Sequence, residues 1–166
     1  MRYKLKTPKN LPPYLKKMIG REVIRTIIDR NEAGVSINGT KFVKYSDSYK
    51  NSELFQAMGK SDLVNLRLFG DMQESMAFRE TRDGVEIYFR ESEEAAKAHG
   101  HDRGSKILPK REWFGLNKSE EKNLIAKYEQ IAQKLEDDGM LTALDLFSRE
   151  GNEDRAGLDV EEFSDE

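Results

Sequence analysis

The only two histidines of the chain lie next to an aspartate, in the stretch His99-Gly100-His101-Asp102. Two imidazoles and a carboxylate can bind a divalent metal ion through nitrogen and oxygen. Metal sites, however, usually draw their ligands from separated segments that further hydrogen bonds hold in place. Because all three groups here lie in one short stretch, we expect His99 to pack at a helix end, and we expect no metal site.

Other patterns that carry chemistry are missing from the sequence. There is no Gly-x-Ser-x-Gly nucleophile turn, no Gly-x4-Gly-Lys phosphate loop and no Gly-x-Gly-x-x-Gly dinucleotide pattern. Cysteine is absent, so neither disulfides nor thiolate ligands are available. Acid–base catalysis needs carboxylates held in a cleft, whereas the acids here lie mostly in polar runs. We therefore expect no catalytic residue, no cofactor and no enzyme.

A second group of side chains that could carry a function lies in LPKREWFGLNKSE, residues 108–120. Lys110 and Arg111 stand beside Trp113 and Phe114, a combination that could contact phosphates and stack on bases. The same residues could form or brace a protein contact surface, and large aromatics are also often buried in a core. We take the protein contact as the main hypothesis and the nucleic-acid-binding module as its alternative.

Composition and charge favour a chain that contacts partners. Hydrophobic residues make up 37% and charged residues 36% of the 166 residues, against a charged share of roughly 25% in ordinary globular proteins. Residues 1–30 hold nine bases and two acids, whereas residues 136–166 hold twelve acids and two bases. No apolar run is long enough to span a membrane and no signal peptide is recognisable, so we expect no membrane partner.

Periodicity predicts the elements that position these residues. Apolar residues at spacings of three and four predict helices over residues 12–30 and 118–137, the second with an Asn117-x-x-Glu120 capping box. Asp83-Gly84 between two alternating runs predicts a hairpin over residues 75–90. The expected fold is α+β, a small, mainly antiparallel sheet packed against two long helices.

The rest of the chain is assigned more coarsely. Residues 1–11 are expected to be a basic arm, 12–137 the α+β domain, and 138–166 an acidic extension with a possible helix over 139–148. Short elements are expected at 41–46 (strand), at 72–76 (helix capped by Asp71) and at 92–100 (helix capped by Ser92). Residues 47–61 are expected to be a long loop packed on the body, which either reaches a neighbour or faces the channel of the assembly. Its surroundings supply three further contact candidates, Tyr45, Tyr49 and Phe55.

The order of these segments resembles the virion-morphogenesis family of tailed phages, also called tail-completion or neck proteins. The family pattern L-x-x-[ST]-G-x-[LM]-x-x-S-[ILM] matches at Leu66, Gly70, Met72, Ser75 and Met76. The segment AAKAHG resembles the family's short histidine helix, and P-x-R-P-F-L-G is matched by Pro109, Arg111, Phe114 and Gly115. Phe69 stands where the family has Ser or Thr, and Glu112-Trp113 replace a proline. The likeness spans roughly residues 10–135.

The resemblance implies a structural role without catalytic residues. Proteins of this family are similar to ring subunits at the head–tail junction, where the ring joins the head connector to the tail. For this chain the resemblance implies a homo-oligomeric ring, which we expect to be hexameric, assembled in the host cytoplasm. Its expected partners are connector or head-closure proteins and tail-terminator or tail-tube proteins, with incidental contact to genomic DNA.

Overall fold

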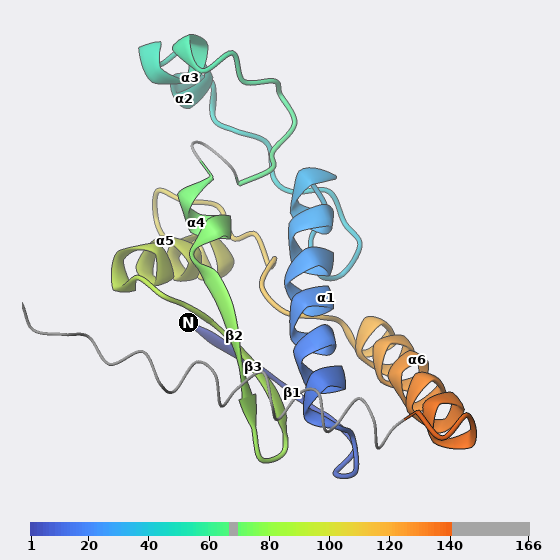
Figure 1. Ribbon diagram of the computed structural model, residues 1–166. Coiled ribbons are helices and arrows are strands. Elements are labelled where there is room, and N and C mark those ends of the chain that lie inside the picture. Colours follow the sequence, from blue (N-terminus) through green and yellow to red (C-terminus); the bar gives the residue numbers. More distant parts are fainter. Residues whose placement is uncertain (67–69, 141–166) are drawn as a thin grey trace, which may run out of the picture.

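The computed structural model describes residues 1–66 and 70–140 and has an α+β architecture. Three antiparallel strands form one sheet in the order β1-β3-β2, and the long helix α1 packs across one face of it (Figure 1). The strands are β1 (Arg2–Lys6), β2 (Met76–Thr81) and β3 (Gly84–Phe89), and the two long helices are α1 (Pro13–Glu32) and α6 (Lys118–Asp137). The expected fold class, a small antiparallel sheet with helices, is confirmed at this level.

Helix α1 forms because one stripe of its surface is apolar. Leu15, Ile19, Val23 and Ile27 recur every four residues and are all fully buried against the sheet. Pro13 occupies the first helical position, where its missing N–H costs nothing. Gly20 faces the ring of Phe78 on β2, and a side chain at that position would collide with it. The helix and the sheet therefore approach each other closely at this one point.

The predicted hairpin and the predicted capping box are both present. Strands β2 and β3 pair from Met76 opposite Phe89 to Thr81 opposite Gly84, with the turn at residues 82 and 83. At the start of α6 the side chain of Asn117 accepts hydrogen bonds from the N–H groups of Ser119 and Glu120, and the Glu120 side chain accepts one from the Asn117 N–H.

Arg2–Lys6, which we assigned to a basic arm, form the edge strand of the sheet. Strand β1 pairs with β3 from Arg2 opposite Tyr88 to Lys6 opposite Gly84. Leu5 is buried on the core side, whereas Arg2, Lys4 and Lys6 are exposed on the open face. The residues are extended, as expected, but their backbone belongs to the domain.

Several short elements differ from their predicted form. The helix predicted over 92–100 is α5 (Ser92–Arg103); Glu91 is its N-cap in place of Ser92, and it ends at Gly104 because that residue, with φ at +73°, leaves the helical region. The loop predicted over 47–61 contains α2 (Asp47–Lys50) and α3 (Glu53–Ala57), capped by Ser46 and Ser52. The helix predicted over 72–76 is α4 (Asp71–Glu74), with Gly70 as its N-cap.

Two further predictions concern residues 41–46 and the chain beyond α6. Residues 41–46 form only one isolated bridge, Val35 with Lys41, in place of the expected strand. The helix predicted over 139–148, and nearly all of the acidic extension, lie outside the described residues. Within residues 1–66 and 70–140, no helix is both long and apolar enough to cross a membrane.

Candidate functional site

The two large aromatics of the loop that precedes α6 belong to the core. Trp113 is completely buried, packs edge-on against Phe89 at 6.2 Å between ring centroids, and donates from Nε1 to the carbonyl of Ala98 at 3.2 Å. Phe114 is also buried, with its ring 5.2 Å from that of Phe89. Neither ring is exposed to a partner or to a nucleic-acid base, which agrees with the alternative that these aromatics are buried in the core. That they brace a contact surface from within stays a prediction.

The carboxylate of Asp102 fixes the backbone of the loop that precedes α6. One oxygen of its carboxylate accepts hydrogen bonds from the backbone N–H groups of Trp113 and Phe114, at 3.1 and 3.3 Å. His99 is exposed on α5, and His101, two residues further along the helix, faces a different direction. Among the described residues there is no cluster of three or more potential metal ligands.

Arg111 connects this loop to Val43 and Tyr45. Its guanidinium is almost fully buried, donates from Nε and Nη2 to the carbonyl of Val43 at 3.1 and 3.0 Å, and lies 5.6 Å from the ring centre of Tyr45. Lys110, in contrast, is exposed and forms an ion pair with Glu112. Arg111 therefore connects the predicted 108–120 stretch to the segment that contains the other aromatic candidates.

That segment, residues 43–63, extends away from the sheet and α1, and we call it the projecting segment (Figure 1). Tyr45, Tyr49 and Phe55 form a triangle of rings with centroids 5.2 to 5.5 Å apart. The triangle is the small core of the segment, since Phe55 is buried and both tyrosines are partly covered. The structure thus brings together three of the predicted contact residues, with Arg111 beside them.

The surface of the projecting segment carries large apolar side chains. Leu54 is 46% and Met58 41% exposed on and just after α3, and Val43 and Leu63 are exposed at the two ends of the segment. Among the described residues the exposed large apolar side chains number eight, and half of them lie in these 21 residues. Such a concentration on a surface segment is typical of a docking site.

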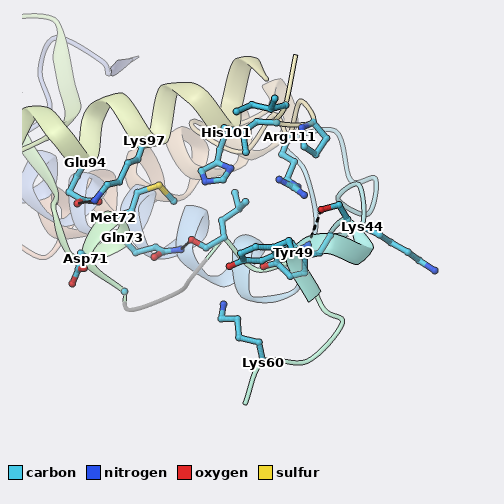
Figure 2. Close-up of a pocket in the computed structure, with 17 residues that line it drawn as sticks. Lys44, Tyr49, Lys60, Asp71, Met72, Gln73, Glu94, Lys97, His101 and Arg111 are labelled. Atoms are coloured by element: carbon cyan, nitrogen blue, oxygen red, sulfur yellow. Dashed lines mark hydrogen bonds and ion pairs between the residues drawn. The ribbon is translucent and has the colours of Figure 1, made fainter. Parts of the chain in front are cut away.

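A cavity of about 610 Å³ separates the projecting segment from α4 and α5 (Figure 2). The segment provides one wall through Tyr45 and Tyr49, and the opposite wall comes from Met72, Gln73 and His101. The remaining lining residues are mostly apolar or basic: Lys44, Ser46, Lys60, Leu66, Gly70, Asp71, Glu94, Lys97, Ile107, Leu108, Pro109 and Arg111.

Two buried polar atoms of this cavity have no hydrogen-bond partner within the described part of the chain. They are Oε1 of Gln73 and Nδ1 of His101. The Nε2 of Gln73 already donates to the carbonyl of Leu66 at 3.2 Å, so its oxygen remains free to accept. Burial, and secondarily the charge of Arg111, lower the pKa of His101, so its ring is neutral near pH 7.

The remaining charges lie at the wall and rim of the cavity. Glu94 is buried and accepts from Lys97 Nζ at 2.6 Å, and this hydrogen bond raises the pKa of Lys97. Figure 2 shows Lys60 and Lys44 further out on the side of the projecting segment. An apolar, aromatic wall with an unpaired amide oxygen and a neutral imidazole suits groups that carry both donors and acceptors, such as a peptide backbone.

Sequence reasoning did not find Gln73, Lys97 or His101 as members of this cavity. Their sequence surroundings are those of ordinary helix surfaces, and the cavity arises because residues of the projecting segment, α4 and α5, which are distant in the sequence, line the same space. Comparisons with protein-family models, with curated proteins and with solved structures find no match to this chain.

Proposed function

We propose that the protein is a structural subunit of the neck of a tailed-phage virion, forming a tail-completion ring that joins the head connector to the tail. The observation that carries this proposal is the projecting segment, with Leu54 and Met58 exposed on a small, firmly braced unit. The resemblance of residues 10–135 to the virion-morphogenesis family supplies the assembly to which such a surface would belong.

A ring requires two different patches on each copy that fit one another around a closed rotation. The exposed side of α3 is one candidate patch in this proposal. The cavity beside it offers a second apolar surface at the same end of the molecule. We expect six copies in the ring, with head-closure proteins on one side and tail-terminator or tail-tube proteins on the other.

The decisive experiment compares two exposed apolar surfaces. Leu54→Asp combined with Met58→Asp removes the apolar side of α3, and Met18→Asp places the same charge on α1, where Met18 is 44% exposed. Only the first variant is expected to lose ring formation in sedimentation and negative-stain microscopy, and to lose complementation of a phage that lacks the gene. Circular dichroism checks that both variants remain folded.

Three outcomes would count against the virion role. They are rings that persist in the Leu54/Met58 variant, equal loss in the Met18 variant, and complete particles formed without the protein. Salt-dependent binding of the purified chain to DNA, without rings, would favour the nucleic-acid-binding alternative. Its contacts would then lie on the open face of the sheet, because Trp113 and Phe114 are buried.

A further inference from the structure

Arg111 is a buried cation that has no anionic partner in the described part of the chain. Only 4% of the residue is exposed. Burial lowers the pKa of its guanidinium, but the group stays protonated at any ordinary pH. Its hydrogen bonds, at 3.1 and 3.0 Å, both go to the uncharged carbonyl of Val43. Because a buried charge is costly without an opposite charge beside it, an anion that reached Arg111 would be bound favourably.

Within the described residues, the guanidinium has donors left for such an anion, and the residue lines a cavity. Its planar fork carries more N–H groups than the two that bond to Val43. The cavity is the space of about 610 Å³ between the projecting segment and α5, a volume typical of small-ligand sites. Figure 2 shows the end of Arg111 pointing toward the projecting segment, beside His101.

The lining of this cavity is basic overall. Four of its residues are Lys or Arg and two are acids. Of the two acids, Glu94 accepts a hydrogen bond from Lys97 at 2.6 Å, and Asp71 is exposed and points away from the other labelled side chains in Figure 2. The cavity therefore favours a ligand that places a negative charge near Arg111.

The rest of the cavity indicates what the negative charge is attached to. Gln73 is 7% exposed, and its Oε1 has no hydrogen-bond partner among the described residues. This oxygen can only accept, and its position is fixed because Nε2 of the same amide donates to the carbonyl of Leu66 at 3.2 Å. The ligand therefore needs an N–H donor as well as an anion. Much of the remaining lining is apolar or aromatic: Tyr45, Tyr49, Leu66, Met72, Ile107, Leu108 and Pro109.

We propose that this cavity binds the carboxyl-terminal end of a partner polypeptide whose last side chain is apolar. The terminal carboxylate pairs with Arg111, a peptide N–H near the chain end donates to Oε1 of Gln73, and the last side chain lies against the apolar lining. A phosphate, with a charge of about −1.5 to −2, would bring more negative charge than one buried guanidinium balances. The inference goes beyond the proposed virion role and does not depend on ring formation.

Fluorescence anisotropy with the unmodified full chain tests the ligand class. The probe is a pool of fluorescein-labelled hexapeptides whose last three residues are drawn from Leu, Ile, Val, Met and Phe. The pool is prepared with a free terminal carboxylate or with a terminal carboxamide. The free acid is expected to bind roughly tenfold or more tightly than the amide. Absence of binding by the free-acid pool, or equal binding of acid and amide, would overturn the proposal.

Two competitors distinguish a chain end from other carboxylates. Hexanoate supplies a free carboxylate and an apolar tail without a peptide N–H. An amidated pool with an internal Glu supplies a side-chain carboxylate. Neither is expected to displace the labelled free-acid pool at concentrations where the unlabelled free acid does. Displacement by either competitor at the same concentration would contradict the assignment to a chain end.

Variants locate the site through the ratio of the two affinities. Arg111→Met is expected to bind the acid and the amide equally. Lys110→Met, which removes an exposed neighbouring charge outside the cavity lining, is expected to keep the preference for the acid. Any loosening of the projecting segment weakens both peptides alike, so the ratio isolates the charge pair. A preference for the acid that survives in Arg111→Met would argue against this site.

Photocrosslinking of the unmodified chain covers the case in which Arg111→Met binds neither peptide. A free-acid peptide with a benzophenone on its last side chain is expected to label Met72 or another residue of the cavity lining, as identified by mass spectrometry. Labels confined to residues outside that lining would show that the chain end binds elsewhere and would overturn the proposal.

Discussion

Arg30 on α1 forms a two-pronged ion pair with Glu120 at the start of α6. Its Nη1 lies 2.9 and 2.7 Å from the two carboxylate oxygens of Glu120, and its Nη2 donates to the carbonyls of Trp113 and Gly115 at 2.8 and 2.6 Å. Since Glu120 is also part of the α6 capping box, one guanidinium links the end of α1, the loop before α6 and the start of α6.

Replacing Arg30 with Ala is therefore expected to destabilise the fold strongly. The side chain is 9% exposed, and its loss removes the hydrogen bonds to two carbonyls and the ion pair with Glu120, a change of about 3–5 kcal/mol in the free energy of unfolding. Arg25→Ala, on the same helix but 82% exposed and in an ion pair with Asp29 at 3.7 Å, is expected to cost less than about 0.5 kcal/mol. Urea unfolding measures both, and equal losses would contradict the linking role.

Gly20→Ala is expected to destabilise the protein although alanine favours helices. The new methyl group would meet the ring of Phe78, and overpacking of this kind costs about 1–3 kcal/mol. Gly100→Ala on α5 is the matched control, because the nearest atom to its added carbon is Leu108 Cδ1 at 3.8 Å. That variant is expected to gain about 0.5–1 kcal/mol from helix propensity. Thermal unfolding of the two variants should shift in opposite directions.

Trp113→Ala tests whether the indole is a core residue. Removing it opens a cavity beside Phe89 and removes the hydrogen bond from the indole to the carbonyl of Ala98, at an expected cost of about 3–5 kcal/mol. Ile107→Ala, in the same connection but almost fully exposed, is expected to change stability little. A Trp113 variant that kept its stability but failed only in assembly would restore the interface interpretation.

Arg111→Met is expected to loosen the projecting segment while leaving the sheet intact. It removes both hydrogen bonds to Val43 and the contact with the Tyr45 ring. Limited trypsin digestion should then cut after Lys44 and Lys50 several-fold faster. Lys110→Met removes a neighbouring exposed charge that pairs with Glu112 and should leave the cleavage rate unchanged. Equal rates in both variants would argue against a bracing role for Arg111.

Stability is expected to fall as the pH drops below about 6.5, and His101 is the expected cause. Burial lowers its pKa in the folded state, whereas the unfolded chain keeps the ordinary value of about 6.5. In that window the unfolded state binds a proton that the folded state does not, so the free energy of unfolding decreases with falling pH. His101→Gln should flatten the curve between pH 5 and 6.5, and His99→Gln should not.

The elements that could be predicted from the sequence are those specified by neighbouring residues. The Asn117–Glu120 capping box, the Asp83-Gly84 turn and the four-residue stripe of α1 each act within one element, so their outcome depends little on the rest of the chain. Strand β1 was missed because its two inward residues, Tyr3 and Leu5, give a weak alternation among three bases. It forms through pairing with β3, which is about 80 residues away along the chain.

The candidate site was predictable only in part, for a related reason. Arg111, Tyr45, Tyr49 and Phe55 were selected from their types and do lie together. Trp113 and Phe114 were selected on the same grounds but face inward, because Asp102 turns the backbone at these residues toward α5. Whether an aromatic side chain faces the core or a partner depends on such distant contacts, which residue type alone does not specify.

The two ends of the projecting segment meet at Gly34. The N–H of Phe42 donates to the Gly34 carbonyl at 2.9 Å, and a side chain at Gly34 would touch Leu63 and the carbonyl of Val64. A segment whose ends are closed in this way can be lengthened at small entropic cost, about 0.6 kcal/mol for each doubling. Residues 43–63 could thus be exchanged for another sequence while the sheet and both long helices keep the local interactions that specify them, so the proposed docking surface could change without a change of the fold.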